Sequence, residues 1–342
     1  MKKFLAMILA LAMVLCLFAG CGDDASTPAD DSTTPADDTA APADGETYEI
    51  GFLPMTLDNE FYVTMVAGAE KFAKENNIKL NIQACTDHSS AEDQLAFIET
   101  MISSGVDAIC ITPVSMDGLV SGVQKCQAAG IPLINLDTKL DAELIESYGC
   151  DPVPFYGTNN YNAAAEGAQY VLDNYPEGTK IAMLTGVEGQ ENTYLRQDGF
   201  WDTIGDKMEL VAAQTANWSV EEGYTAAQNI LTANPDVEMF YCCNDSMAIG
   251  AMRACEEAGK ELPIIGFDAV AEAVGYVKDG KMAATIAQYP ISMAEEGLQA
   301  CLDILNGKTA YTDLPAETDT GAKAITTDGA EEYLAYLAEY GL

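Results

Sequence analysis

Two stretches of this chain repeat the same order of polar and apolar segments. The first is ACTDHSSAEDQLAFIETMISSGVDAICITPVSMDGLVSGVQKCQAAGIPLINLD (84–137), and the second is AQTANWSVEEGYTAAQNILTANPDVEMFYCCNDSMAIGAMRACEEAGKELPIIGFD (213–268). Each runs through a polar loop, a helical pattern, an apolar run, a second helical pattern and a final apolar run that ends in Asp. The first Thr of each copy precedes this Asp by 51 and 53 positions, respectively. The repeat therefore predicts two units of the same topology.

The apolar runs predict strands that are covered by helices on both faces. Residues 108–111 (AICI) and 239–242 (MFYC) are continuously apolar, as is typical of strands in a parallel sheet. Helical patterns at 91–103 and 224–232 alternate with them, which indicates crossover helices. We therefore predict an α/β fold with two similar doubly wound, parallel-sheet (Rossmann-like) lobes joined by a hinge. One large unduplicated α/β domain would not explain the matched spacing.

The N-terminus has the layout of a secretory signal. Two lysines precede an apolar run of 15 residues (4–18), shorter than the roughly 20 that a membrane-spanning helix needs. The segment LFAGC (17–21) resembles a bacterial lipobox, in which the signal is removed before a cysteine that is then lipidated. We predict a signal peptide over 1–20 and lipidation of Cys21. An ordinary signal peptide followed by an unmodified cysteine is the alternative.

Residues 21–46 predict an acidic, disordered tether. After Cys21 this stretch holds only Gly, Ala, Ser, Thr, Pro, Asp and Glu, which cannot bury enough apolar surface to fold. Such a segment holds a globular body away from a membrane surface. The whole chain has 16 Lys and Arg against 54 Asp and Glu, a formal charge of -38. Nucleic acid and anionic membrane surfaces are therefore poor partners, and we expect an extracytoplasmic protein that meets the membrane through its lipid anchor.

The remaining cysteines do not have the spacing of a metal site. No CxxC pair occurs, and His88 is the only histidine, so we predict no zinc. No phosphate-loop motif and no nucleophile elbow occur either, so we predict no cofactor and no catalytic residue. His88 is expected in a loop near the cleft mouth. We interpret eight cysteines as buried thiols, with one or two disulfides as the alternative. These are Cys85, Cys110, Cys126, Cys150, Cys242, Cys243, Cys255 and Cys301.

Polar and aromatic side chains follow the predicted strands in both copies. Ligands of doubly wound sheets bind outside the carboxyl ends of the strands, so these side chains are candidates for a binding site. Carboxylates, amides and guanidinium groups match the hydroxyls of a sugar, and aromatic rings cover its C–H faces. The candidates are Asp58, Asn59, Phe61, Tyr62, Thr112 and Asp137 in the first copy, and 187–196, Asn217, Trp218, Asn244, Asp245, Asp268 and Gln288 in the second.

Several candidates also have an ordinary structural explanation. Phe61 and Tyr62 can be core residues at the start of a helix. Asp137 and Asp268 can be helix caps or members of hinge ion pairs. Trp218 lies in a polar loop and is less easily explained as a core residue.

Five segments, in this order and spacing, resemble the ribose-type periplasmic binding proteins of ABC sugar importers. The similarity covers about 47–308, almost the whole of the globular body. The segments are LDNEFY (57–62), INLD (134–137), NPDVEMFYCCNDSMAIGAMRA (234–254), IIGFD (264–268) and KMAATIAQYP (281–290).

The resemblance implies a binding protein that closes about a hinge and delivers its ligand to the permease of an ABC importer, and we expect a monomer. The candidate site carries two carboxylates (Asp137 and Asp268) against one guanidinium (Arg196), so we expect the ligand to be a neutral monosaccharide or related polyol. Three segments would cross between an N-terminal lobe (47–157 with about 289–320) and a C-terminal lobe (158–288 with about 321–342). Thr158 and Asn160 fall near the first crossing, as hinge or ligand residues. The implied ligand residues are Asn59, Phe61, Tyr62 and Asp137 in the first lobe, and Arg196, Trp218, Asn244, Asp268 and Gln288 in the second lobe and hinge.

The chain departs from the ribose-type pattern at two positions. Thr138 stands where Arg follows the Asp of the first lobe, and Thr112 replaces a typical Asn. One fork of hydrogen bonds is therefore missing, which puts ribose itself in doubt as the ligand. We also expect a long loop over 139–155 at the rim of the pocket.

Two other functional classes share parts of this pattern. A repressor of the lactose-repressor type has a similar two-lobed core but needs a basic helix-turn-helix, where this chain has a signal and an acidic tether. A binding partner of a membrane sensor or chemoreceptor has the same sequence features and stays open as an alternative. We do not expect an enzyme.

Overall fold

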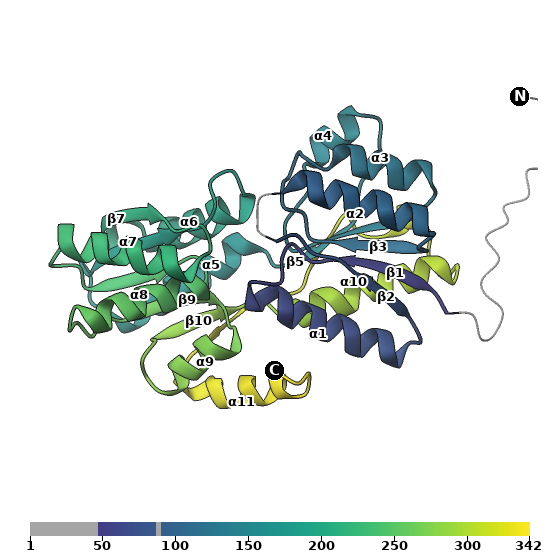
Figure 1. Ribbon diagram of the computed structural model, residues 1–342. Helices are drawn as coiled ribbons and strands as arrows, with labels where there is room; N and C mark the ends of the chain where they lie inside the picture. Colours follow the sequence, from purple (N-terminus) through teal and green to yellow (C-terminus); the bar gives the residue numbers. More distant parts are fainter. Residues whose placement is uncertain (1–46, 87–89) are drawn as a thin grey trace, which may run out of the picture. The chain divides into compact units, whose positions relative to one another are not determined.

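The computed structural model describes residues 47–86 and 90–342. The predicted signal peptide, the lipidation site Cys21, the tether and His88 lie outside the described residues. Within the described part the chain forms two six-stranded sheets, each covered by helices (Figure 1). This architecture confirms the predicted pair of α/β lobes.

The first sheet is parallel throughout, in the order β11-β5-β4-β3-β1-β2. The second has the order β12-β10-β9-β8-β6-β7 and is parallel except for β12, which runs antiparallel to β10. The first sheet comprises β1 (Glu49–Leu53), β2 (Lys79–Ile82), β3 (Ala108–Ile111), β4 (Leu133–Leu136), β5 (Phe155–Gly157) and β11 (Glu317–Asp319). The second comprises β6 (Lys180–Thr185), β7 (Glu209–Thr215), β8 (Met239–Cys242), β9 (Ile264–Asp268), β10 (Ala284–Ala287) and β12 (Lys323–Ile325).

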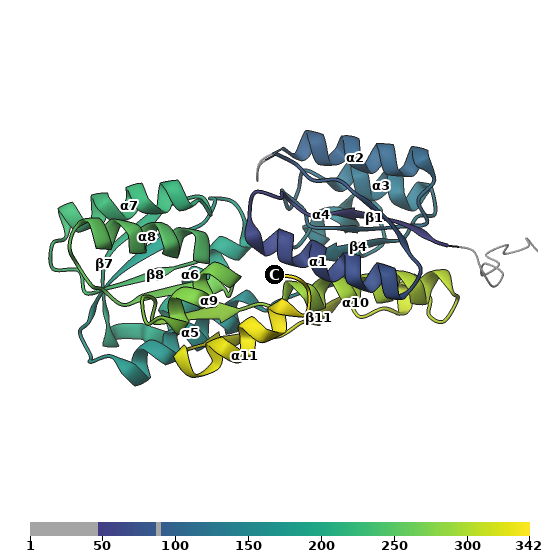
Figure 2. The ribbon, with the colours of Figure 1, turned by 60° about the horizontal axis from the view of Figure 1, so that its bottom comes forward.

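Helices cover both faces of each sheet. In the first lobe α1 packs on α10 and α2 on α3, while in the second α5 packs on α6 and α7 on α8 (Figures 1 and 2). The C-terminal helix α11 packs on α9 (Figure 2). The first lobe contains α1 (Glu60–Glu75), α2 (Ala91–Ser104), α3 (Val120–Ala128), α4 (Ala142–Ser147) and α10 (Pro290–Leu305). The second contains α5 (Asn160–Asn174), α6 (Glu191–Ile204), α7 (Val220–Ala233), α8 (Asp245–Glu257), α9 (Ala271–Lys278) and α11 (Thr327–Ala338).

Side chains of the central strands alternate between the two faces of their sheet. In β3, Ile109 belongs to an apolar cluster with Ile98 and Met101 of α2. Its neighbour Cys110 belongs to a cluster with Met65 of α1. A strand that is buried on both faces has no solvent-facing side, which explains why β3 is apolar throughout.

Asparagine residues set the start of two helices at the strand ends. The side chain of Asn59 accepts a hydrogen bond from the Phe61 amide at 3.0 Å and so caps α1. Asn244 accepts one from the Met247 amide at 2.9 Å and caps α8. Because each cap directly follows a loop after a parallel strand, it lies at the carboxyl edge of its sheet.

Three connections join the two sheets. They are the segments between β5 and α5, between β10 and α10, and between β11 and β12. The second of them returns the chain to the first lobe, where α10 packs on β3, β4 and β5. The first lobe is therefore built from segments that are far apart in the sequence.

Two local expectations need correction. The segment 139–155 is not one long loop, because it contains α4, whose N-cap Asp141 accepts a hydrogen bond from the Leu144 amide at 2.9 Å. Six residues are too few to give a helical period that the sequence can reveal. The predicted helix at 224–232 extends over Val220–Ala233, because Ser219 provides the cap at an earlier position.

All eight cysteines of the described residues are buried free thiols, as we predicted. Cys110 and Cys301 have their sulfur atoms 3.6 Å apart, between β3 and α10. Burial raises the pKa of the Cys126, Cys242, Cys243 and Cys255 thiols, so at neutral pH these side chains behave as small neutral hydrophobes.

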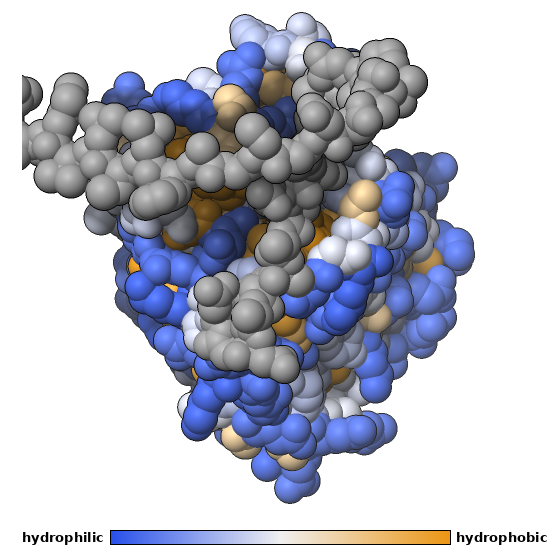
Figure 3. All heavy atoms as spheres, turned by 90° about the vertical axis from the view of Figure 1, so that its right-hand side faces the viewer, coloured by the Kyte–Doolittle hydropathy of each residue, from blue (hydrophilic) through white to orange (hydrophobic). Residues whose placement is uncertain are grey.

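The face shown in Figure 3 is dominated by hydrophilic residues, with small apolar patches between them. Over 47–86 and 90–342, no helix is both long enough and apolar enough to cross a membrane.

We predict that Gly250→Ala destabilises the protein by about 1 to 3 kcal/mol, the usual range for overpacking. A Cβ at Gly250 of α8 would lie 2.3 Å from the Val220 carbonyl oxygen of α7, so the two helices would have to separate. Chemical denaturation measures the free energy of unfolding. Gly275→Ala is the control, because its Cβ would meet no atom within 4 Å, and it should be neutral or slightly stabilising.

Candidate functional site

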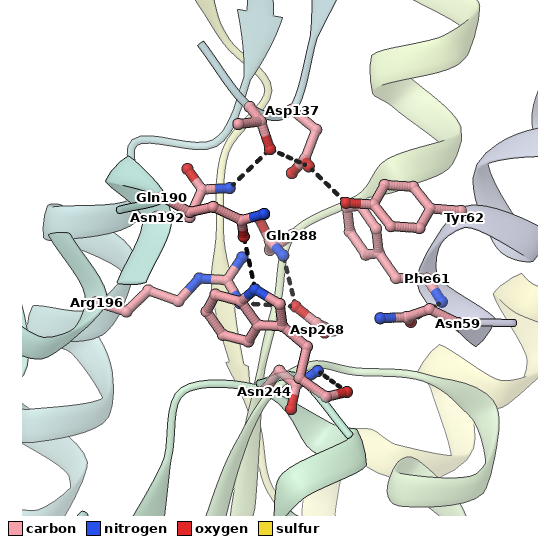
Figure 4. Close-up of a pocket in the computed structure, with 12 residues that line it drawn as sticks. Asn59, Phe61, Tyr62, Asp137, Gln190, Asn192, Arg196, Asn244, Asp268 and Gln288 are labelled. Carbon is pink, nitrogen blue, oxygen red and sulfur yellow. Dashed lines mark hydrogen bonds and ion pairs between the residues drawn. The ribbon is translucent and has the colours of Figure 1, made fainter. Parts of the chain in front are cut away.

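A cavity lies where the carboxyl ends of the two sheets face each other (Figure 4). Its walls come from both lobes, from residues that end or follow β1, β4, β6, β7, β8, β9 and β10. The twelve lining residues are Asn59, Phe61, Tyr62, Asp137, Thr138, Gln190, Asn192, Arg196, Trp218, Asn244, Asp268 and Gln288.

Nine of the eleven residues predicted as ligand-binding lie in this lining; that they bind a ligand stays a prediction. Thr112 and Thr158 are not among the lining residues. The Thr112 hydroxyl lies 3.7 Å from the sulfur of Met65, in the core of the first lobe. The Thr158 hydroxyl donates to the Gln288 carbonyl oxygen at 3.1 Å or to that of Gly321 at 3.2 Å. Thr158 thus ties the three connections together.

Three lining residues are not among the eleven predicted ligand residues. Gln190 and Asn192 lie in the candidate range 187–196, where Gln190 is the N-cap of α6 and Asn192 belongs to its first turn. Thr138 follows β4 and is noted in the sequence only as a departure from the ribose-type pattern. The rule that selects polar residues after each strand also covers these three positions.

Arg196 is the centre of the hydrogen-bond network in the second lobe. Its guanidinium Nη1 donates to Asp268 Oδ1 at 3.1 Å and to the Cys243 carbonyl oxygen at 2.7 Å. Its Nε donates to Asn160 Oδ1 at 2.7 Å. Gln288 Nε2 donates to the same Asp268 oxygen at 2.6 Å. These bonds hold the carboxylate through one oxygen, Oδ1.

Asp137 has a separate set of partners. The Tyr62 hydroxyl donates to Asp137 Oδ2 at 3.2 Å, and the Thr138 hydroxyl donates to the same oxygen at 3.0 Å. Asn192 of the second lobe donates to the Thr138 hydroxyl oxygen at 3.4 Å (Figure 4). A chain of polar contacts therefore crosses the cleft from Asn192 to Tyr62.

Trp218 provides a fixed aromatic surface. Its indole nitrogen donates to Gln190 Oε1 at 2.7 Å, and only 8% of its surface is exposed. A Cβ at Gly186 would lie 1.8 Å from the Trp218 ring, so only glycine there lets the ring lie against the backbone. Phe61 and Tyr62 supply further rings from the first lobe. Both line the cavity and both belong to the apolar core, so the interpretation as core residues and the interpretation as site residues do not exclude each other.

Backbone strain concentrates at the cavity. Seven non-glycine residues of the described part have positive φ, and six of them line the cavity or adjoin a residue that does. Such conformations cost of order 1 to 3 kcal/mol each and persist where the surrounding structure enforces them. The six are Asp137, Asn217, Trp218, Asp268, Ala269 and Tyr289.

Two buried polar atoms at the cavity have no hydrogen-bond partner within the described part of the chain. They are Gln190 Nε2, a donor, and Gln288 Oε1, an acceptor. A buried polar atom without a partner costs about 1 to 3 kcal/mol. A ligand that presents one acceptor and one donor would remove this cost.

The charges of the site are two carboxylates and one guanidinium. Burial raises the pKa of Asp137 and raises that of Asp268 to about 7, while Arg196 opposes both shifts. Burial also raises the pKa of Tyr62, which keeps its hydroxyl a donor. The described residues contain no group of three or more His, Cys, Asp or Glu side chains that could hold a metal ion.

Two parallel-sheet lobes, three connections and a polar cavity with aromatic walls at the facing strand ends define a two-lobed binding protein. Comparison with known proteins identifies the family. A family model described as a periplasmic binding protein domain matches residues 50–309, and the chain belongs to this family.

Similar proteins include sugar-binding components of ABC importers. The chain is 31% identical over 269 residues to the ribose import binding protein of Bacillus subtilis (strain 168), covering 79% of this chain and 85% of that protein. It is 32% identical over 253 residues to the D-allose-binding periplasmic protein of Escherichia coli (strain K12), covering 72% and 81%, respectively.

Solved structures have the same fold. An ABC transporter periplasmic solute-binding protein from Actinobacillus succinogenes with bound D-allose matches with a TM-score of 0.79 and 32% identity, covering 84% of this chain and 100% of that one. The myo-inositol-binding protein of Caulobacter matches with a TM-score of 0.77 at 24% identity, which supports the fold alone. Members of this family are non-enzymatic transport components, so this chain is a binding protein and not an enzyme, as predicted.

We predict that the ligand-free protein becomes less stable as the pH rises from 5 to 8. The pKa of about 7 for Asp268 lies above its ordinary value of about 3.9, so the folded protein binds this proton more tightly than the unfolded chain does. The resulting stability is fully present below about pH 4 and is lost as the pH rises through about 7. Asp268→Asn should flatten the dependence of Tm on pH.

The control for this experiment is Asp236→Asn. Asp236 is an exposed carboxylate whose pKa is lowered by Lys180, so it stays ionised from pH 5 to 8 and its substitution should leave the slope of Tm against pH unchanged. Calorimetry in matched buffers gives Tm at each pH. An Asp268→Asn variant with the same slope as the native protein would show that this carboxyl does not titrate in this range.

Proposed function

We propose that this protein is an extracytoplasmic substrate-binding lipoprotein of an ABC importer. It binds a neutral monosaccharide or related polyol in the cavity between its lobes and delivers it to the permease. The observation that carries the proposal is the cavity itself, in which carboxylates, amides, one guanidinium and aromatic rings converge from both lobes.

The polar groups favour a molecule with several hydroxyls. Each hydroxyl both donates and accepts, so it can satisfy the Gln288 acceptor and the Gln190 donor that lack partners in the described structure. The carboxylates of Asp137 and Asp268 accept charge-assisted hydrogen bonds, each contributing on the order of 1.5 to 3 kcal/mol. The rings of Trp218 and Phe61 can cover the apolar faces of a sugar ring.

The charge of the cavity disfavours an anion. Asp137 and Asp268 outnumber Arg196, so the site carries a formal charge of about -1 when all three are ionised. Arg196 already donates to Asp268, Asn160 and the Cys243 carbonyl, which leaves few of its five donors for a phosphate or carboxylate. A neutral ligand avoids the repulsion from both carboxylates.

The lining of the cavity is closed to solvent. All twelve of its residues are buried, so a ligand at this position would be enclosed on most sides. An enclosed ligand can enter and leave only when the lobes separate.

Movement about the three connections provides that separation. We infer an N-terminal lobe of 47–157 with about 289–320, and a C-terminal lobe of 158–288 with about 321–342. Because the two lobes supply different lining residues, only a closed form makes both sets of contacts at once. Thr158, through its bonds to the Gln288 and Gly321 carbonyls, supports the hinge that this movement requires.

The similar proteins support a sugar ligand without specifying it. Their names include ribose and D-allose, and a similar solved structure contains D-allose. In this chain Thr138 bonds Asp137 and accepts from Asn192, where the ribose-type pattern has an Arg. The hydroxyl is shorter and leaves space that an Arg would fill, which favours a ligand other than ribose.

We predict that a neutral sugar or polyol binds more tightly than any anionic relative. Calorimetric titration should cover pentoses, hexoses, polyols, sugar phosphates and sugar acids. Asp268→Ala should weaken the best ligand at least tenfold, about 1.4 kcal/mol, because it removes a charge-assisted acceptor. Trp218→Ala should have a comparable effect through lost stacking and buried area. Tighter binding of any anionic member than of every neutral one would contradict the proposal.

We predict that Cys21 is diacylated after signal removal and retains the protein on the membrane. One acyl chain binds a bilayer only marginally, whereas two anchor it stably. Cell fractionation and mass spectrometry of the N-terminal peptide should show that Cys21→Ser releases a processed protein. Retention of the processed Cys21→Ser variant on the membrane would show that the anchor lies elsewhere.

A further inference from the structure

A carboxylate of the first lobe caps a helix of the second. Glu60 is the first residue of α1, and Ala271 is the first residue of α9. The Ala271 amide donates to Glu60 Oε1 at 3.0 Å. The bond joins residues 211 positions apart and crosses the cleft between the lobes.

Helix α9 has no side-chain cap of its own. Its N-cap residue is Val270, which cannot accept a hydrogen bond through its side chain. The first amides of a helix lack partners within the helix, and its N-terminus carries a partial positive charge. A carboxylate there satisfies a donor and is attracted by the helix dipole. Glu60 supplies from the opposite lobe what the sequence before α9 lacks.

The surroundings of Glu60 fit this role. Its carboxylate is partly buried, and burial raises its pKa, whereas the amides of Ala271 and Glu272 oppose that shift. The Glu272 carboxylate repels Glu60 and adds to the rise. The amides of α9 therefore hold the Glu60 carboxylate against both burial and a like charge.

This contact adjoins the cavity on both sides. Glu60 stands between Asn59 and Phe61, which both line the cavity. Ala271 follows the lining residue Asp268 by three positions. Between them, the Ala269 amide donates a hydrogen bond to the Thr285 hydroxyl oxygen at 3.1 Å, which holds this stretch of backbone against β10. A ligand held by Asn59 and Asp268 would therefore bring the Glu60 carboxylate and the first turn of α9 together.

We propose that Glu60 is a positioning residue for ligand retention, whose carboxylate caps α9 of the opposite lobe and holds the cleft closed. The inference rests on the proposed function, since it requires a ligand that is released by opening of the lobes. Glu60 touches no part of the ligand in this scheme. It acts through the fraction of molecules that are closed, and so through the rate of ligand dissociation.

The experiment removes each partner of the bond separately. Glu60→Ala removes the acceptor, and Glu60→Gln keeps an amide oxygen that accepts without full charge. Ala271→Pro removes the donor, and proline is favoured at the first position of a helix. Val270 has φ -66° and ψ 153°, a conformation that the residue before a proline adopts readily. Glu70→Ala is the matched control, because Glu70 lies exposed on the same helix.

Stopped-flow fluorescence with D-allose as the probe should separate association from dissociation. We expect Glu60→Ala to raise the dissociation rate about tenfold, Ala271→Pro to have a similar effect and Glu60→Gln a smaller one. The association rate should not fall, because the open fraction of the ligand-free protein rises, and the Glu70→Ala variant should match the native protein. The double variant should dissociate no faster than either single variant, because both remove the same bond. Additive effects, or equal dissociation rates for Glu60→Ala and Glu70→Ala, would overturn the proposal.

Small-angle scattering of the ligand-free variants provides a test that needs no ligand. Loss of the bond should raise the radius of gyration of Glu60→Ala and Ala271→Pro above that of Glu70→Ala. If native protein does not bind D-allose, the choice of this sugar fails and scattering alone decides the role of Glu60. Equal radii for all variants would then overturn that role.

Discussion

The buried guanidinium of Arg196 is the interaction on which the cavity depends. It lies 4% exposed, with its positive charge balanced by Asp268 and its other donors directed to Asn160 and the Cys243 carbonyl. An isolated buried charge would be strongly unfavourable, so these partners have to be present before the strand ends of the second lobe can approach one another. The same bonds connect β8, β9 and the start of α5, which fixes the second wall of the cleft.

The protonation of Asp268 also determines which ligands the cavity can bind. One oxygen of Asp268 accepts hydrogen bonds from both Arg196 and Gln288. Burial raises the pKa of this carboxyl to about 7, so near neutral pH a change in its hydrogen bonds changes the fraction that is protonated. A ligand hydroxyl that donates to the carboxylate favours the ionised form and should release a proton on binding. Asp137 stands apart, held by Tyr62 and Thr138 rather than by a cation in direct contact. The two carboxylates thus give the two lobes different acceptors for one ligand.

Several single hydrogen bonds join the lobes outside the three connections, and such weak contacts fit the proposed opening of the cleft. The bond of Asn192 to Thr138 crosses the cleft at 3.4 Å, and the bond of Ala271 to Glu60 crosses it at 3.0 Å. Each is a single hydrogen bond whose partners can return to water when the lobes separate, at a net cost of about 0.5 to 1.5 kcal/mol. Such modest terms allow the binding energy of a small ligand to shift the population between open and closed forms.

The sequence by itself determined the two parallel-sheet lobes and most of the cavity. Continuous apolar runs such as AICI at 108–111 predict buried strands, and the rule that ligands bind at their carboxyl ends selects Asp137, Trp218 and Asp268. These inferences succeed because burial and strand direction leave a local pattern. Only the tertiary structure showed that Thr112 points into the core, that a helix interrupts 139–155, and that Gln190 orients Trp218. It alone placed Glu60 at α9, because a contact across 211 positions depends on how two separately folded units meet and leaves no periodicity in either.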